Sequence, residues 1–295
     1  MECKTLNTLF ELPRSQFDRV KPLYADAQFD QPCYASVFEG KVPARIFVDD
    51  ADAPKSALMF RSYEYFVAGE AHPLMRQFIK DAPEEAEEFE WFYGYVPLTD
   101  AWKNALLSDL PLEIIGRCNF QWQPGTPVYD WRAAVPANGR IVPIDVTLAE
   151  RLDRDYYPVP FIQFAFDTYE AFEQYGWGFA LFVGDALASS ISTTAVSRQH
   201  ALVTIDTEAP FRKRGFATLL GARFIEESLS RGLIPTWDTD DFNHGSIATA
   251  RKLGFVEHDP FVELALPNRA RPDRSRGLWS PSPRADGVTV WSRNS

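Results

Sequence analysis

The sequence predicts an α+β protein, with a mixed and mostly antiparallel sheet flanked by helices and, before it, a smaller α/β domain. Three observations carry this prediction. After residue 138 the order is helices, antiparallel strands, then a strand–helix–strand unit, as in a mixed sheet. Proline and glycine gather over 121–139, as they do in connecting segments. The 295 residues suffice for about two ordinary domains. We therefore predict domains over 1–138 and 139–295.

Composition and charge exclude several classes of protein. Hydrophobic residues make up 45% and charged residues 24% of the chain, near the globular average, and no apolar run approaches the roughly 20 residues of a bilayer span. The net charge of -11 disfavours nucleic acid and anionic membrane as partners and favours a cationic small molecule. Cys3, Cys33 and Cys118 form no CxxC pair and indicate incidental thiols. The N-terminus lacks a secretory signal, so we expect a cytoplasmic protein.

The N-terminal half has the patterns of a mixed α and β domain. Short apolar runs predict strands over 44–48, 57–60 and 65–68. An acidic stretch over 84–90 follows a proline and predicts an exposed helix. Its glutamates indicate a solvated helix face rather than a metal or catalytic site.

The second half alternates strand and helix patterns. Strands are predicted over 141–146, 179–183, 186–194, 201–207 and 233–238, with Gly184 and Asp185 forming a hairpin turn. Helices are predicted after a capping box from Thr147 to Glu150 and over 168–174, 215–230 and 246–252. The runs 261–266 and 288–291 predict edge strands. The tail over 267–287 is rich in proline and arginine and is expected either to be disordered or to wrap the domain.

The stretch with the clearest chemistry joins the strand over 201–207 to the following helix. Its loop carries Arg212, Lys213 and Arg214 directly before Gly215. Such a loop turns backbone N–H groups outward at a helix N-terminus, where the helix dipole favours an anion. A pyrophosphate fits this arrangement, and a solvated basic turn that merely starts a helix is the alternative.

A second pattern follows this helix. Asn243 precedes a segment that ends in Lys252-Leu253-Gly254-Phe255, whose glycine suits a left-handed helix cap. In the loop, Arg212 is followed by two residues, then Gly, one residue and Ala217. Both patterns, in this order, resemble the GCN5-related N-acetyltransferases (GNAT). The resemblance, strongest over 140–260, implies the GNAT fold, two strands that splay apart around acetyl-CoA, and no metal.

A narrower resemblance concerns the phrases Ile205-Asp206-Thr207, Pro235–Asp238 and Asn243–Ser246. They are similar to the branch that includes zwittermicin-resistance-type enzymes, which carry an N-terminal region before the catalytic domain. The resemblance implies that 139–295 is the catalytic domain and that 1–138 is a degenerate GNAT-like fold that shapes the acceptor site.

The family resemblance also implies which residues hold acetyl-CoA. The backbone of Ile205 and Thr207 would pair with the pantetheine arm, and the loop amides would hold the pyrophosphate. Asn243 would bond to the pantetheine, cap the following helix, or do both. The implied cofactor-binding residues are Ile205, Thr207, Arg212, Lys213, Arg214, Gly215, Phe216, Ala217, Asn243 and Ser246.

The acid and base depart from the family pattern. Many relatives carry a tyrosine where this chain has Ala250, so Ser246, His244 or a water would protonate the leaving thiolate. Many also carry a glutamate on the strand before the loop; here His200 and Asp206 are the nearest candidates. Asp206 and Asp238 lie where the two strands should diverge. They would act as base, water relay or amine anchor, or would only form hydrogen bonds at the strand ends. The catalytic candidates are Asp206, Asp238 and Ser246.

An acidic cluster, Asp238-Thr239-Asp240-Asp241 with His244, has the residue types of a metal site but not the spacing of a calcium loop, and we expect no metal. With Trp177 and the Tyr156-Tyr157 pair it favours recognition of a cationic or polyhydroxylated acceptor. Asp238→Asn is therefore expected to raise the KM for the acceptor or to lower kcat.

These patterns favour an acetyl-CoA-dependent N-acetyltransferase that acts on a primary amine of a small molecule, such as an antibiotic-like natural product in self-resistance or detoxification. A non-catalytic GNAT-fold protein that sequesters an amine or senses CoA is the alternative. Ala250 in place of tyrosine supports that alternative, and the intact basic loop opposes it. A protein-modifying acetyltransferase stays open, as do the acceptor's identity and the oligomeric state.

Overall fold

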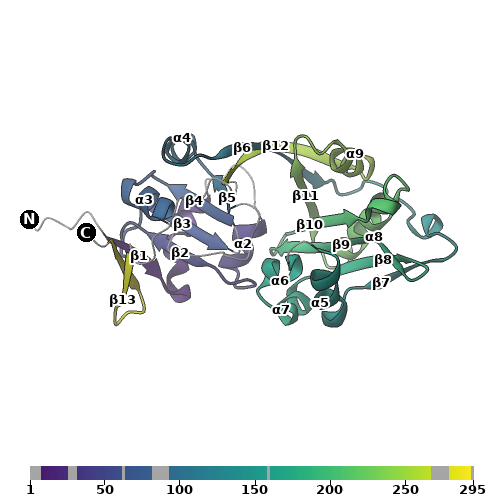
Figure 1. Ribbon diagram of the computed structural model, residues 1–295, viewed down its shortest axis with the longest axis horizontal. Coiled ribbons are helices and arrows are strands. Elements are labelled where there is room, and N and C mark those ends of the chain that lie inside the picture. Colours follow the sequence, from purple (N-terminus) through teal and green to yellow (C-terminus); the bar gives the residue numbers. More distant parts are fainter. Residues whose placement is uncertain are drawn as a thin grey trace, which may run out of the picture. The chain divides into compact units, whose positions relative to one another are not determined.

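The computed structural model describes residues 8–25, 32–61, 64–81, 93–157, 160–266 and 279–293. The chain forms two compact units. Unit 1 comprises 1–29, 44–115 and 262–295, and unit 2 comprises 30–43 and 116–261. This division differs from the one predicted near residue 138, because the strand after the last helix of each unit continues into the other unit (Figure 1).

Unit 1 is a mixed sheet with helices. Its strands lie in the order β13-β14-β1-β2-β3-β4-β5, and the last residues of β12 pair with β5. The pair β4–β5 is parallel, and the other adjacent pairs are antiparallel. The elements are β1 (Thr8–Leu12), α1 (Lys21–Ala25), β2 (Arg45–Val48), β3 (Ser56–Arg61), β4 (Glu64–Gly69), α3 (Pro73–Asp81), β5 (Tyr93–Pro97), α4 (Asp100–Asp109), β13 (Trp279–Pro283) and β14 (Thr289–Arg293).

The parallel strands of unit 1 stay paired along their length. Residues 64–67 lie opposite 94–97, and the N–H of Leu98 donates to the carbonyl of Val67 at 3.3 Å. Trp102 of α4 is fully buried, and its indole N–H donates to the carbonyl of Ala68 at 3.2 Å. The hydrophobic core of unit 1 therefore covers the end of β4.

A half-buried ion pair joins three strands of unit 1. Arg45 on β2 donates to both carboxylate oxygens of Glu11 on β1, at 2.7 and 2.8 Å, and the indole N–H of Trp291 on β14 donates to Glu11 at 2.9 Å. Burial by itself raises the pKa of Glu11, but the hydrogen bonds from Arg45 and Trp291 outweigh it and hold that pKa below its usual value.

Glu11→Gln is expected to lower the free energy of unfolding by about 1–3 kcal/mol at neutral pH, because it removes charge-assisted hydrogen bonds from a half-buried guanidinium. Because the folded pKa is depressed, this stability is present above about pH 4.5 and is lost as the pH falls through the folded value. The wild type and the variant should converge in acid, as denaturant titrations across pH would show. Asp18→Asn is the control, since its 4.0 Å pair with Lys21 is exposed, and the expected change is below about 0.5 kcal/mol. An equal effect of both variants at every pH would contradict the assignment.

Unit 2 holds a second mixed sheet in the order β6-β11-β10-β9-β8-β7. The pair β10–β11 is parallel, and the pairs β6–β11, β9–β10, β8–β9 and β7–β8 are antiparallel. The elements are α2 (Pro32–Phe38), β6 (Glu113–Trp122, from residue 116), β7 (Gly139–Pro143), α5 (Val146–Asp155), α6 (Phe161–Phe166), α7 (Tyr169–Tyr175), β8 (Gly178–Val183), β9 (Ala186–Val196), β10 (His200–Thr207), α8 (Phe216–Ser230), β11 (Ile234–Asp240), α9 (His244–Lys252) and β12 (Phe255–Leu266, to residue 261).

Helices cover both faces of the unit 2 sheet. On one face, the guanidinium of Arg223 on α8 lies 4.0 Å from the ring centroid of Phe179 on β8. On the other face, the hydroxyl of Tyr157, just after α5, lies 2.7 Å from that of Ser190 on β9. The two contacts are on opposite faces because Phe179 is paired with Ile191, the neighbour of Ser190. Unit 2 is therefore an α+β unit with helices on both faces of a mixed sheet, as the sequence predicts.

The parallel strands of unit 2 separate after a short contact. Residues 200–202 of β10 pair with 234–236 of β11. Beyond them β11 pairs with β6 as far as Asp240, while β10 pairs with β9 as far as Thr207, with an irregularity in register at Leu202/Val203. The edge of β10 that faces β11 is thus left open, and this opening frames the site.

Most predicted elements around this opening are confirmed. The hairpin glycine Gly184 has φ 61°, and Gly254 ends α9 with φ 90°. The predicted capping box at Thr147 is wrong, because the side chain of Asp145 accepts from the N–H of Leu148 at 2.8 Å and starts the helix earlier. The helix predicted over 84–90 lies outside the described residues.

The C-terminal region is described from residue 279 onward, and there the tail forms the hairpin of β13 and β14. The run 288–291 was expected to form an edge strand. Instead, β14 lies between β13 and β1. Among the described helices, none is long and apolar enough to cross a bilayer.

Candidate active site

The basic loop of unit 2 ends in an open helix N-terminus. Gly215 is the N-cap of α8 with φ 84°, and no side chain caps the helix there. The carbonyl of Gly215 accepts the first intrahelical bond, from Leu219 at 3.0 Å. The N–H groups of residues 216–218 therefore have no acceptor within the helix, an arrangement that suits the binding of an anion. A Cβ added at Gly215 would meet nothing within 4 Å, so the approach is open.

The three basic side chains of the loop have different roles. Arg212 is fixed by a 2.8 Å hydrogen bond from its Nε to the carbonyl of Thr207, and Lys213 lines the cavity described below. Arg214 lies over the ring of Phe211, 5.4 Å from its centroid, outside the cavity lining. Two of the three predicted cations are thus at the cavity.

The open edge of β10 presents backbone groups to the same region. The N–H of Glu208 donates to the carbonyl of Ala188 on β9 at 3.0 Å. Since backbone groups alternate in direction along a strand, those of Ile205 and Thr207 point away from β9, towards the gap beside β11. These are the two residues predicted to pair with a pantetheine arm.

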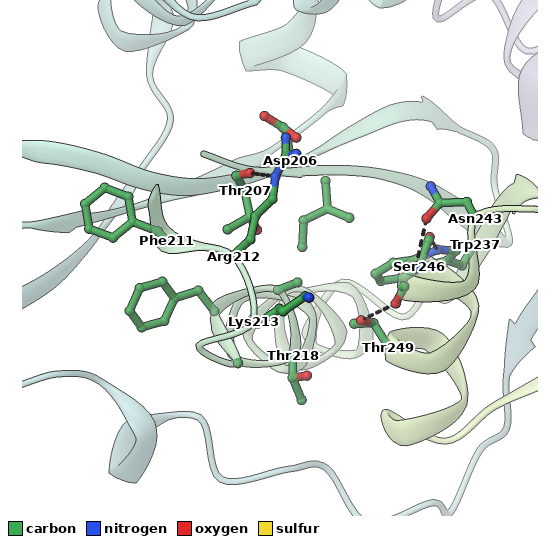
Figure 2. Close-up of a pocket in the computed structure, with 15 residues that line it drawn as sticks. Asp206, Thr207, Phe211, Arg212, Lys213, Thr218, Trp237, Asn243, Ser246 and Thr249 are labelled. Carbon is green, nitrogen blue, oxygen red and sulfur yellow. Dashed lines mark hydrogen bonds between the residues drawn. The ribbon is translucent and has the colours of Figure 1, made fainter. Parts of the chain in front are cut away.

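A cavity of about 600 Å³ occupies this gap, within the usual size range of small-molecule sites. It extends from Phe211 and Arg212 at one end to Asn243 and Ser246 at the other (Figure 2). The predicted site residues all line it, except Asp238 and Arg214.

The N-terminus of α9 forms one end of the cavity. The side chain of Asn243 accepts from the N–H of Ser246 at 3.2 Å, which makes Asn243 the N-cap while it still lines the cavity. The hydroxyl of Ser246 accepts a hydrogen bond from the indole N–H of Trp237 at 2.8 Å. Asn243 can therefore fill both of the roles considered for it.

The two predicted catalytic aspartates differ in their surroundings. Asp206 is exposed and lines the cavity. Asp238 lies outside the lining and forms an ion pair with Arg117 on β6, which also binds Asp240 at 2.5 Å. The register explains this pairing, since Asp240 lies opposite Arg117 and side chains two residues apart share a face.

The remaining acid–base candidates, His200 and His244, both lie outside the cavity lining. His200 is buried at the start of β10, where β10 and β11 are still paired, and His244 is exposed at the start of α9. Among the described residues, no group of three His, Cys, Asp or Glu side chains is arranged to hold a metal ion.

Of the aromatic residues expected to recognise the acceptor, Trp177 lies in the core and Tyr157 lies on the same face of the sheet as Asp206. Trp177 is buried and stacked on Phe224 at 5.6 Å, so it belongs to the core. Tyr157 lies on the Asp206 face of the sheet, because its partner Ser190 is paired with Asp206. Burial raises the pKa of the Tyr157 phenol, and the carboxylates of Asp206 and Glu208 nearby act in the same direction.

Five residues of the cavity wall were missing from the prediction: Phe211, Thr218, Trp237, Gly245 and Thr249. Phe211 and Thr218 adjoin the loop, and Thr249 follows Ser246 by three residues on the same helix face. Adding these helix and loop neighbours to the prediction would have found three of the five.

The sequence matches a known protein family. A sequence profile described as GNAT acetyltransferase matches residues 21–263. The uncharacterized N-acetyltransferase YdfB of Bacillus subtilis (strain 168) is 25% identical over 261 residues, covering 85% of this chain and 95% of that protein.

Solved structures show the same fold. A GCN5-related N-acetyltransferase-like protein from Streptococcus suis 89/1591 has a TM-score of 0.71 at 22% identity, covering 85% of this chain and 98% of that one. A tandem GNAT protein from the clavulanic acid biosynthesis pathway has a TM-score of 0.57 at 17% identity, covering 88% of this chain and 98% of that one. The two mixed sheets of this chain are consistent with such a tandem arrangement.

Proposed function

The chain belongs to the GNAT acetyltransferase family and is an acyltransferase, and we propose that it moves an acetyl group from acetyl-CoA to a primary amine of a small molecule. The observation that carries this proposal is the 600 Å³ cavity between an open strand edge and an uncapped helix N-terminus. The anion-binding amides and the free strand edge meet there.

The residues of the cavity fit the parts of acetyl-CoA. The N–H groups of residues 216–218 and the charges of Arg212 and Lys213 would hold the pyrophosphate. The backbone of Ile205 and Thr207 would pair with the pantetheine amides, as an added strand would. Asn243, at the other end, would donate its side-chain amide to the same arm while its carbonyl caps α9.

Bound acetyl-CoA supplies the acyl group as a thioester. Asp206 is the proposed base that accepts the proton of the amine, directly or through a water. A backbone N–H on the open edge of β10 would donate to the carbonyl oxygen as negative charge develops on it. Ser246 would donate a hydrogen bond to the leaving sulfur, in the role that many relatives give to a tyrosine at the position of Ala250.

The proposed acceptor carries a primary amine, and an antibiotic-like natural product is one example. Three features support an amine: the net charge of -11, the exposed carboxylate of Asp206, and the carboxylates close to Tyr157. The proposal places the reaction in the cytoplasm and requires no metal, and it assigns unit 1 the part of a degenerate GNAT-like repeat.

Release of free CoA thiol, measured against a panel of primary amines, tests the proposal. Thiol release should require the amine, and mass spectrometry should find the product heavier by one acetyl group. The corresponding alcohols are the matched controls and should give no release above hydrolysis. Tight binding of acetyl-CoA with no turnover on any amine would instead support the non-catalytic alternative.

One acetyl-CoA is expected to bind per chain. The parallel strands of unit 2 separate and leave a gap, whereas those of unit 1 stay paired. In unit 1, Trp102 also covers the end of β4. Isothermal calorimetry measures the stoichiometry directly. A second equivalent with comparable affinity would show that unit 1 also opens.

A further inference from the structure

Trp237 and Ser246 form a hydrogen-bonded pair in the wall of the cavity. The indole Nε1–H of Trp237 donates to Oγ of Ser246 at 2.8 Å. An indole N–H can only donate, and a serine hydroxyl has one proton of its own to give. The bond therefore occupies an acceptor position of the hydroxyl and leaves its proton for another partner.

Among the described residues, no group close to Ser246 accepts that proton. Within the part of the chain that the structure describes, its hydroxyl makes no second hydrogen bond, and the residue is half-buried in the cavity wall. The hydroxyl of Thr249 is turned away to the carbonyl of Gly245 at 2.8 Å. The hydroxyl of Ser246, which lines the cavity, therefore has a proton available for a ligand there.

Trp237 is itself held firmly. It is 2% exposed, its ring meets Phe255 edge-on at 5.6 Å, and a Cβ at Gly221 on α8 would lie 3.6 Å from it. A ring fixed from several sides holds its N–H in one direction, so the hydroxyl it binds is fixed as well. The helix dipole of α9 adds positive potential at the same point.

We propose that Trp237 is a positioning residue that aims the hydroxyl of Ser246 at the sulfur of CoA and thereby lowers the pKa of the bound thiol. The inference rests on the proposed function for the identity of the ligand. Figure 2 shows Ser246 and Trp237 across the cavity from Arg212, where the sulfur would lie if the pyrophosphate is held by the loop.

The consequence for the reaction concerns the leaving group. As the amine nitrogen bonds to the acetyl carbon, the carbon–sulfur bond breaks and its electron pair goes to the sulfur, while Asp206 takes the amine proton. Ser246 keeps its proton and donates a hydrogen bond to the thiolate. A hydrogen bond that strengthens as charge develops stabilises the transition state more than the bound substrate.

The test measures the pKa of the thiol of bound CoA, by its ultraviolet thiolate absorbance, and needs no turnover. In the wild type this pKa should lie below that of free CoA titrated in the same way. Ser246→Ala should raise it by about 1–2, since a hydrogen bond to a charged group is lost. Trp237→Phe should raise it by about 0.4–1, and the double variant should match Ser246→Ala.

Two further measurements separate positioning from packing. Because Trp237→Phe leaves a gap in the core, site-specific replacement of Trp237 by its benzothiophene analogue, which keeps both rings and lacks the N–H, should give the same shift. With a reactive amine, kcat should fall about 2- to 12-fold in the Trp237 variants while the Kd for acetyl-CoA stays unchanged. In a Ser246→Ala background the Trp237 change should have no further effect.

Each outcome decides a different claim. An unshifted thiol pKa in all variants, or equal losses from Trp237→Phe with and without Ser246, would overturn the positioning role. A shifted thiol pKa in a protein that acetylates no amine would overturn the proposed function and leave this inference standing. Failure of CoA to bind would overturn both.

Discussion

Gly215→Glu is expected to weaken the binding of acetyl-CoA by at least about 5-fold. Gly215 has φ 84° and opens α8 without a side-chain cap. A residue other than glycine is strained there by about 1–2 kcal/mol, but this strain is present with and without the ligand and therefore lowers stability and not affinity. A carboxylate about 4 Å from a phosphate adds roughly 1–4 kcal/mol of repulsion in the complex, which corresponds to about 5- to 900-fold in Kd and can be measured by calorimetry.

The chain provides a matched control at the other end of the same helix. Gly232 has φ 74° and, like Gly215, meets nothing within 4 Å of an added Cβ, but it lies outside the cavity lining. Gly232→Glu therefore introduces the same strain and the same charge away from the site. Gly232→Glu should lose more stability in a thermal melt, because the helix dipole disfavours a carboxylate at this end and favours it at Gly215, but only Gly215→Glu should lose the stabilisation by acetyl-CoA. Similar Kd values for the two variants would remove the loop from the cofactor site.

The loop and the helix after it were predictable because their signals are local. The conformational freedom of Gly215, the cations before it and the apolar face of the helix lie within one short stretch of sequence. The opening between β10 and β11 was expected from the family resemblance, and the register shows it. A local pattern can therefore predict an open helix N-terminus without knowledge of the rest of the chain.

The pairings that the sequence did not reveal span long separations. Asp238 and its partner Arg117 are 121 residues apart, and no periodicity in either segment indicates that their strands are neighbours. The bounds of the compact units differ from the predicted split for the same reason, since 116–122 belongs to unit 2 and 264–266 pairs into unit 1. Strand pairing is set by tertiary packing, so a split drawn at a Pro/Gly-rich segment cannot detect it.

Asp206→Asn is expected to lower kcat/KM for the amine by roughly 100-fold, the usual scale for loss of a general base. Asparagine keeps the size of the side chain and cannot accept the proton. The defect should shrink as the pH approaches the pKa of the amine, about 10.4 for an alkylamine, because the amine is then already neutral and water or hydroxide can take the one proton that it loses after attack. Initial rates across pH at saturating acetyl-CoA measure this directly. A defect that is constant across pH would mean that Asp206 anchors the acceptor and does not take its proton.

Asp238→Asn makes the same chemical change on the neighbouring strand and separates the two aspartates. The side chains of Asp238 and Arg117 are 18% and 21% exposed, and the carboxylate has its partner outside the cavity lining. Its replacement should lower the free energy of unfolding by about 1–3 kcal/mol, because the guanidinium of Arg117 loses the carboxylate of Asp238. The change in kcat/KM should be smaller than about 3-fold, in contrast to the loss expected from the sequence. If Asp238→Asn showed the large, pH-dependent defect and Asp206→Asn did not, the proton would leave through β11, and Arg117 would have to release Asp238 during the reaction.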